Sequence, residues 1–410
     1  MHADNALSPH GGEILEQVLP SEALPQRVLP RLPLSRGAAS ECLGLAFGFF
    51  APLKGFMGAT ELASVGERMR LPSGLVFPLP VILDVSLETV SDLGLRTGGQ
   101  VLLTLRGQDF ALLTVEDIFR WDRETLARQV YGTADPRHPG VRRMLRRAEM
   151  LIAGPVEMLA RPKVAEPFTR FFFTPLELRA EIARRGWRRV VAHQSRNVPH
   201  TGHEWLMKSA WFASEADGVL VSAVVGEKRE GDYIDEAIVL GHAALARAGY
   251  LRPEAHMTSL LLWDMHYAGP REAVFHAIVR KNLGCTHHMF GRDHAGVGNY
   301  YDPYASQRIF DELPDLGIRP VLIQEWAYCP KCQGIAYQGL CGHDLERQPF
   351  SGSLIRSILL DGVQPPGLIM RKEVFDTVQA ASAEFGFGSP FVGPEYLERR
   401  HPVLEAGALR

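Results

Sequence analysis

The second half of the chain alternates short apolar strands with helix candidates, and this alternation constrains the fold most strongly. From about residue 170 the strand candidates are 189–194, 218–225, 256–262 and 286–290. The helix candidates are 175–185, where Thr174 and Glu177 form a capping-box pattern, and then 203–215, 233–248, 271–283 and 307–313. Such alternation predicts an open, mostly parallel α/β sheet, in which ligands bind at the carboxyl ends of the strands.

The first 165 residues have a different pattern. Short strands are expected at 77–85, 100–105 and 110–115, with helices at 60–69 and 122–131, and Gly and Pro separate them. We therefore expect three domains. They are a β-rich sheet or small barrel at 1–165, a catalytic α/β domain at 166–325, and a small domain at 326–410 that has a Cys/His cluster and helices at 354–361 and 371–384. Residues 160–167 carry two prolines and are expected to form a linker.

The charge balance excludes some classes of protein. Lys and Arg total 44 against 47 Asp and Glu, a net charge of −3, so the chain lacks the positive field of a general nucleic-acid binder. No apolar stretch approaches the ~20 residues that span a bilayer, and the N-terminus lacks a secretory signal pattern. Five cysteines, three of them within thirteen residues, suggest a reducing compartment, which we expect to be the cytoplasm, and a metal site.

The most informative segment runs from Gln194 to His203, where the strand 189–194 leads into a helix. It contains His200-Thr-Gly-His203, in which two imidazoles three residues apart can face a common ligand. A helix N-terminus offers free N–H groups and partial positive charge to an anion, and Arg196 adds a permanently charged fork. This segment, with Gln194, Ser195 and Asn197, predicts an anion or phosphate site.

Three further segments are weaker candidates. Gly291-Arg-Asp-His-Ala295 follows a strand and could present backbone N–H groups and Arg292 to an anion, or could be an ordinary turn. Ser351 to Arg356 could bind phosphate or only cap a helix. The basic run 142–147 is expected to be a solvated helix face, with a phosphate-contact patch as the alternative.

Cys329-Pro-Lys-Cys332, followed by Cys341-Gly-His343, predicts a metal site. Three thiolates and one imidazole make a closed tetrahedral set for Zn²⁺, so its role would be structural. The chain lacks a G-x-x-x-x-G-K-[ST] phosphate loop, and H-E-x-x-H and G-x-S-x-G are also absent.

These motifs, taken in order, resemble the ATP sulfurylase (sulfate adenylyltransferase) family. Segments 9–12, 52–57, 130–140 and 154–156 resemble its N-terminal PUA-like domain. Segments 194–203, 225–232, 267–273, 280–287 and 291–298 resemble its nucleotidylyltransferase domain, and the Cys cluster resembles that of zinc-carrying members without a kinase domain. His193 and Ser195 stand where the family usually has Phe and Thr.

The resemblance implies a reversible reaction in which AMP passes from MgATP to sulfate, giving adenylyl sulfate and pyrophosphate. It implies that Gln194 and Arg196 hold sulfate, and that Ser195, Arg196 and Asn197 line the reacting centre. His200 and His203 would face the phosphates. Gly291, Arg292, Asp293 and His294 would contact the nucleotide, and the Ala295 backbone would touch sulfate. A homodimer is also implied. The net charge and the short apolar stretches predict no nucleic-acid and no membrane partner.

Two other functions are compatible with the residues alone. One is another H-x-G-H nucleotidylyltransferase with a different acceptor, against which Gln194 and Arg196 favour a small tetrahedral oxyanion. The other is a non-enzymatic RNA-binding barrel with a zinc knob, which the net charge disfavours.

Overall fold

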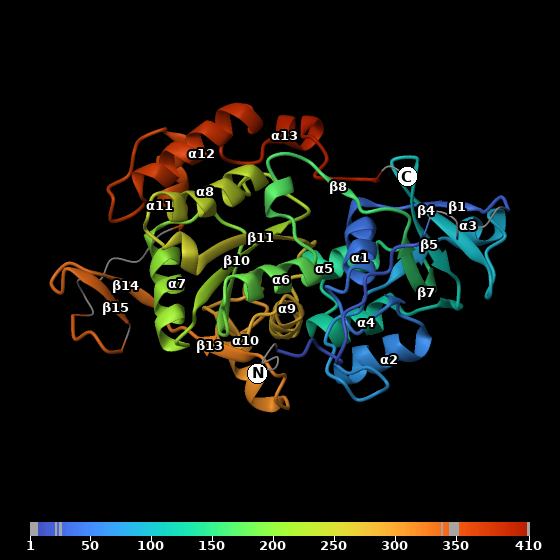
Figure 1. Ribbon diagram of the computed structural model, residues 1–410. Coiled ribbons are helices and arrows are strands. Elements are labelled where there is room, and N and C mark those ends of the chain that lie inside the picture. The colour runs from blue at the N-terminus through green and yellow to red at the C-terminus, as the bar shows by residue number, and fades with distance from the viewer. Residues whose placement is uncertain (1–6, 21–22, 24–26, 338, 344–351, 408–410) are drawn as a thin grey trace.

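The computed structural model describes residues 7–407 except 21–22, 24–26, 338 and 344–351, and Figure 1 shows its arrangement. An N-terminal β-rich part lies on the right of the view and an α/β part in the centre. A two-stranded hairpin projects on the left, and the C-terminal helices lie along the top. Among the described residues no helix is both long and apolar enough to cross a membrane.

The N-terminal part is a seven-stranded sheet organised around one long strand. Its strands are β1 (Arg31–Pro33), β2 (Gly55–Phe56), β3 (Leu83–Val85), β4 (Gln100–Leu105), β5 (Gln108–Thr114), β6 (Asp117–Arg120) and β7 (Met150–Met158). The main path is β1-β4-β5-β7-β2, and β3 and β6 also pair with β7. β7 therefore pairs with four other strands, which is the open sheet or half-barrel that short strands around one hub produce.

The N-terminal part is more helical than the sequence pattern suggests. Its helices are α1 (Arg36–Ala46), α2 (Ala59–Arg68), α3 (Leu87–Asp92), α4 (Arg123–Tyr131) and α5 (Pro139–Leu145). The strand expected at 77–85 is wrong for its first six residues, because only β3 forms. Pro78 and Pro80 cannot donate to a strand ladder, although Phe77, Leu79 and Val81 are buried there.

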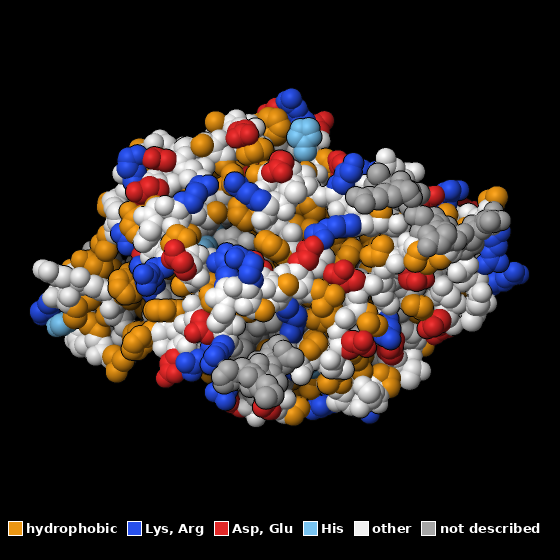
Figure 2. Space-filling model, in the orientation of Figure 1, with side chains coloured by type: hydrophobic (Ala, Val, Ile, Leu, Met, Phe, Trp, Pro, Cys, Tyr) orange, Lys and Arg blue, Asp and Glu red, His pale blue; other side chains and the backbone are white. Residues whose placement is uncertain are grey.

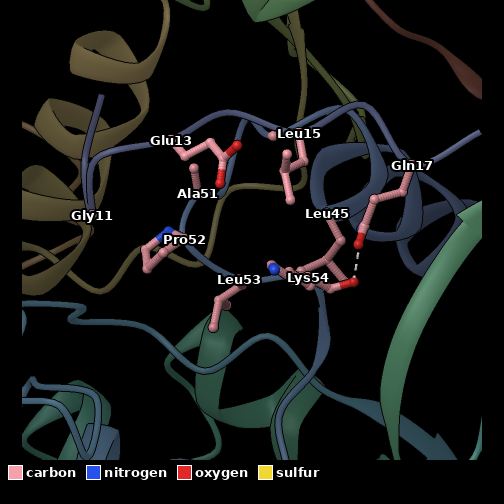
Figure 3. A pocket seen from close by; sticks show the side chains of 10 residues that line it. Gly11, Glu13, Leu15, Gln17, Leu45, Ala51, Pro52, Leu53 and Lys54 are labelled. Atoms are coloured by element: carbon pink, nitrogen blue, oxygen red, sulfur yellow. Dashed lines mark hydrogen bonds between the residues drawn. The ribbon is translucent and has the colours of Figure 1, made fainter. Parts of the chain in front are cut away.

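A small pocket lies in this part, where the N-terminal strap crosses the loop after α1 (Figure 3). Its volume is about 220 Å³, and Glu13 and Lys54 line it. Gln17 donates to the Lys54 carbonyl at 2.8 Å and so fixes the strap over the loop. The pocket contains none of the residues predicted to carry chemistry.

The central part is a five-stranded sheet in which all pairs are parallel, as expected. Its strands are β9 (Val190–Ser195), β10 (Gly218–Val225), β11 (His256–Leu262), β12 (His287–Phe290) and β13 (Arg319–Leu322). They are ordered β11-β10-β9-β12-β13, so the first strand of the sheet is its middle strand. The flanking helices are α6 (Pro175–Arg184), α7 (Thr201–Ala213), α8 (Asp235–Arg247), α9 (Pro270–Asn282) and α10 (Ala305–Arg308). α8 and α9 lie on opposite sides of the sheet (Figure 1).

The C-terminal segment packs back onto both other parts. It contains the hairpin β14 (Trp326–Cys329) and β15 (Gly334–Tyr337), the helices α11 (Gly352–Leu360), α12 (Lys372–Phe385) and α13 (Pro394–Arg399), and β16 (Leu404–Glu405). α12 packs against α8. β16 pairs with β8 (Lys163–Val164), so the expected linker at 160–167 contains a short strand.

One hydrophobic core joins the N-terminal and central parts. Phe50 and Phe77 of the N-terminal part contact Phe275 of α9, at ring-centroid distances of 5.3 and 5.9 Å, and Phe50 also contacts Trp263 at 5.4 Å. The buried Asn282 side chain donates to the carbonyls of Phe49 and Ala51. This apolar and hydrogen-bonded contact holds the central sheet in a fixed position against the first domain.

Candidate functional site

The two best sequence candidates lie side by side at the carboxyl edge of the central sheet. β9 and β12 are neighbours, with Ala192 paired to His288, and one candidate loop follows each strand. From β9 the chain goes one way to β10 and β11, then returns to place β12 on the other side of β9. This reversal is the switch point at which open α/β sheets bind ligands.

The histidine pair lies together at the start of α7, which begins at Thr201 rather than at the expected His203. His200 is the N-cap, and its Nδ1 accepts from the Gly202 N–H at 3.1 Å. The rings of His200 and His203 are 4.0 Å apart between centroids. The His200 proton is therefore on Nε2, and the pair stands beside the positive end of the α7 dipole.

Burial keeps these imidazoles neutral. It lowers the pKa of His203 to about 4 and the pKa of His200 well below its ordinary value. His193 is also buried, within 5.9 Å of His203 and 5.8 Å of His242 between ring centroids, and burial lowers its pKa in the same way. At neutral pH the group can donate hydrogen bonds to an anion without carrying charge of its own.

Arg196 contacts Tyr267 and Asp232, which the sequence patterns did not identify as its partners. Its Nη1 donates to the Tyr267 hydroxyl at 2.7 Å, its guanidinium lies over the Tyr267 ring at 5.2 Å, and Asp232 lies 3.7 Å from Nη2. Arg229 also stands over the Tyr267 ring, at 4.8 Å. Two guanidiniums therefore meet one aromatic ring beside a single carboxylate.

Tyr267 has a backbone φ of 60°, in the left-handed region that a bulky residue rarely occupies. Such a conformation costs about 1–3 kcal/mol and persists only where the surroundings hold it. This strain is a signal that sequence periodicity cannot provide. It marks the turn that delivers the Tyr267 hydroxyl to Arg196.

The other candidate residues of this segment lie at the end of β9 and just after it. The Gln194 side chain is part-buried, and its amide donates to the Met265 sulfur at 3.7 Å. The Ser195 hydroxyl donates to the Asn197 carbonyl at 3.0 Å and accepts from the Asn197 N–H, so it closes the turn after the strand. The same carbonyl accepts from His242 at 3.2 Å.

The β12 loop, Gly291 to Ala295, presents its residues in different directions. Arg292 and Asp293 are exposed, and Arg292 lies 3.0 Å from Glu325 and 3.3 Å from Asp293. His294 points inward, where its Nε2 is 3.1 Å from Nδ1 of the buried His276. Asp293 and Ala295 have φ values of 55° and 57°, which turns the backbone sharply between Arg292 and Gly296.

The other two candidate segments are placed differently. Ser351 lies outside the described residues, and Arg356 lies over the Tyr233 ring at 4.6 Å and bonds to the Gly231 carbonyl. Within the basic run, Arg143 and Arg147 bind other parts of the chain. Arg147 pairs with Asp84 at 3.0 Å, whereas Arg142 and Arg146 are exposed, so the predicted solvated face holds for only part of the run.

The four candidate metal ligands converge at the β14–β15 hairpin. The ligand atoms of Cys329, Cys332, Cys341 and His343 all lie within 4.8 Å of one another. His343 Nδ1 is 3.6, 3.4 and 3.5 Å from the sulfurs of Cys329, Cys332 and Cys341. A hydrogen bond from the Cys332 backbone lowers the pKa of Cys329 to about 6. The cluster is compatible with a tetrahedral metal ion.

Charged side chains of both signs lie on the surface of the molecule (Figure 2). Figure 2 shows acidic and basic side chains interspersed over one face of the molecule. A local anion site therefore depends on its own residues, and not on a general positive field.

The chain is similar to known proteins over most of its length. The ATP-sulfurylase family model matches residues 169–381, and the PUA-like domain model matches residues 7–161. A sulfate adenylyltransferase of Archaeoglobus fulgidus is 38% identical, with 97% of this chain and 96% of the relative covered. One of Hyperthermus butylicus is 43% identical, covering 90% and 95%. The hexameric APS kinase from Thiobacillus denitrificans has a similar fold, with a TM-score of 0.72 at 23% identity, over 92% of this chain and 68% of that one.

We predict that the folded state loses stability as pH falls below about 6.5. Burial lowers the pKa of His10, His203 and His256 to about 4 and that of His266 to about 3. Between these values and 6.5 the unfolded chain binds more protons, so each histidine removes about 1.4 kcal/mol per pH unit of acidification.

Two buried carboxyls oppose this effect. Burial raises the pKa of Glu41 and Glu236 to about 7, so these groups favour the folded state as pH falls from 7 to 4.5. The buried histidines outnumber these two carboxyls, since burial also lowers the pKa of His193 and His200, and the balance is a net loss. Calorimetry should show a lower Tm at pH 5.5 than at pH 7.5, and an equal or higher Tm at pH 5.5 would contradict the assignment of neutral buried histidines.

Proposed function

The chain belongs to the ATP-sulfurylase family and has sulfate adenylyltransferase activity, and we propose that the reaction takes place at the switch point between β9 and β12. The observation that carries this placement is that Arg196, oriented by Tyr267, and the histidine pair at the N-terminus of α7 lie on the one loop that follows β9. The Arg196 guanidinium, which can bind a sulfate through two N–H groups, and the N-terminus of α7, which can bind a nucleotide phosphate, then lie on one loop.

In this proposal Gln194 and Arg196 bind sulfate. Tyr267 and Asp232 hold the Arg196 guanidinium before substrate arrives, which reduces the ordering needed on binding. The exposed Arg292, together with Gly291 and Asp293, contacts the nucleotide of MgATP. The Ala295 backbone N–H meets sulfate from the β12 side, while the His294 ring, directed at His276, supports the loop from beneath.

The chemical step is direct attack of a sulfate oxygen on the α-phosphorus, with pyrophosphate leaving. Sulfate carries no proton that must be removed, so catalysis consists of positioning and charge stabilisation. His200 and His203 donate hydrogen bonds to the phosphates as charge builds on the leaving group. Ser195 and Asn197 set the shape of the loop between the two binding groups. The reverse reaction, which makes ATP from adenylyl sulfate and pyrophosphate, uses the same contacts.

We assign the chain to three domains. Residues 1–165 form the PUA-like domain, 166–325 the H-x-G-H nucleotidylyltransferase domain, and 326–410 a small domain that contains the metal cluster. The few cysteines and the need for reduced thiolates in the cluster support a cytoplasmic location.

We further propose that Cys329, Cys332, Cys341 and His343 bind Zn²⁺. A zinc tetrahedron with bonds of about 2.3 Å to sulfur and about 2.0 Å to nitrogen has S···S edges near ~3.8 Å and S···N edges near ~3.5 Å. The Cys332–Cys341 separation is 3.8 Å, and the three sulfur–nitrogen separations are 3.4–3.6 Å. Bound there, the ion would cross-link the hairpin and leave no position open for substrate.

The activity is tested by sulfate-dependent release of pyrophosphate from MgATP, coupled to a pyrophosphatase. Substitution Arg196→Ala removes the anion fork, and we expect kcat/KM for sulfate to fall by about 10²–10³-fold or more, the range found for lost oxyanion donors. The matched control is Arg188→Ala, an exposed arginine just before the same strand. A near-normal rate for Arg196→Ala would reject Arg196 as a sulfate ligand.

We predict one zinc ion per chain, measured by elemental analysis of purified protein. Cys332→Ser should lower the zinc content and the Tm, because a structural ion contributes its binding energy to folding. His401→Asn, an exposed histidine outside the cluster, is the control. Full zinc content in Cys332→Ser, or no zinc in the parent protein, would contradict this assignment.

We propose that the chain forms a homodimer. α7 exposes Trp205, Trp211 and Phe212, whose exposed fractions are 41%, 41% and 81%, and a helix with such side chains is a common interface. Light scattering should give twice the chain mass of 45.5 kDa, and Phe212→Glu should shift the protein toward the monomer. A monomer at all concentrations would contradict the proposal.

A further inference from the structure

Helix α5 of the N-terminal part packs directly against the loop that carries Tyr267. The loop runs from Asp264 to Ala268, after β11. At Gly140 of α5 a Cβ atom would lie 2.2 Å from the His266 carbonyl, so only glycine permits this approach. The two backbones are therefore in contact at the boundary between the first and second domains.

Arg143 of α5 joins two loops of the catalytic part. Its Nη2 donates to the Met265 carbonyl at 2.7 Å, and its Nη1 lies 3.2 Å from the Glu227 carboxylate. The Glu227 N–H in turn donates to Asp264 at 2.6 Å. One planar guanidinium thus fixes the loop after β10 against the loop after β11, in the fork geometry that a lysine could not reproduce.

His138, the N-cap of α5, holds the strained residue of the same loop. Its Nδ1 accepts from the Gly140 N–H at 3.1 Å, which leaves the proton on Nε2, and Nε2 donates to the Tyr267 carbonyl at 3.1 Å. A residue with a left-handed φ keeps that conformation only when its neighbours fix it. His138 therefore fixes the backbone that presents the Tyr267 hydroxyl to Arg196.

Both loops lead to the residues proposed to bind sulfate. The Met265 sulfur accepts a hydrogen bond from the Gln194 amide, and the Tyr267 hydroxyl accepts one from Arg196. Asp232, in the loop after β10, lies 3.7 Å from Arg196. Arg143 contacts Met265 itself and Glu227, which precedes Asp232 by five residues. His138 contacts Tyr267 itself. The first domain is thus connected to the anion site by a chain of direct bonds.

We infer that α5 is the positioning element of the sulfate site, with Arg143 and His138 as its positioning residues. This inference rests on the proposed role of Gln194 and Arg196 in binding sulfate. It gives the N-terminal domain a part in substrate affinity. Arg143 and His138 contact the loop that carries the partners of Gln194 and Arg196, so loss of either should weaken sulfate binding more than nucleotide binding.

The test compares Arg143→Ala with Arg142→Ala in the full-length enzyme. Arg142 is the preceding, exposed residue of the same helix and is the matched control. We expect Arg143→Ala to raise the KM for sulfate about tenfold, with the KM for MgATP changed less than twofold, and Arg142→Ala to change neither. Tm is measured for each variant, because a merely structural role would lower Tm without separating the two KM values.

Glu227→Gln keeps the proposal testable if Arg143→Ala does not fold. Glu227 is half exposed, and this change removes the negative charge from one of the two partners of Arg143. It should raise the KM for sulfate about threefold and leave that for MgATP unchanged. Equal KM values in Arg143→Ala and Arg142→Ala, or parallel rises for sulfate and MgATP, would overturn the inference. Absence of sulfate-dependent turnover in the parent enzyme would instead overturn the proposed function.

Discussion

A parallel sheet that begins with its middle strand leaves a space between oppositely directed connections, and the rest of this molecule depends on that constraint. β9 is the first strand and lies at the centre, so the chain leaves it in one direction to reach β10 and later returns to place β12 on its other side. Loops that are almost a hundred residues apart in sequence then end at one edge. The N–H groups at the start of α7 face that edge, and an anion is the ligand they favour.

Burial is the second condition of the site. Imidazoles packed beneath the carboxyl edge are neutral because burial lowers the pKa of each, and neutral rings can pack close together without repulsion. Permanent charge is supplied by arginines at the rim, where Tyr267 and Asp232 orient Arg196. Arginine side chains therefore carry charge at every physiological pH, whereas the buried imidazoles are neutral and can still donate hydrogen bonds.

Contacts between the domains explain why such a loop can be precise. The aromatic cluster of Phe50, Phe275 and Trp263, together with the bonds from Asn282, makes one continuous core across the boundary. Against that rigid support, α5 can hold a loop of the neighbouring domain in a strained conformation. A domain with only a small polar interface to the catalytic part could not hold the loop in this way, because such interfaces permit relative motion.

Much of the local structure follows from the sequence because its determinants are local. The strands β4, β10 and β11 agree with the expected bounds, since continuous apolar runs between turn residues specify buried strands, and Thr174 and Glu177 form the expected capping box. The ligand types in the Cys/His cluster are likewise visible in the sequence. The expected strand over residues 77–85 fails where prolines interrupt an apolar run. The sequence pattern does not predict the long hub strand β7, because Gly154 and Pro155 interrupt its apolar run.

The sequence by itself determined the family, the parallel α/β class and the chemical types at the site, because motif spacing and residue identity are local properties. Only the tertiary structure decided which side chains meet. Tyr267 and Asp232 reach Arg196 from the loops after β11 and β10, and Arg143 of α5 contacts both of those loops. His294 points into the core although its motif follows β12. Such contacts depend on strand order and domain packing, which arise from cooperative burial over the whole chain and leave no periodic trace in any one segment.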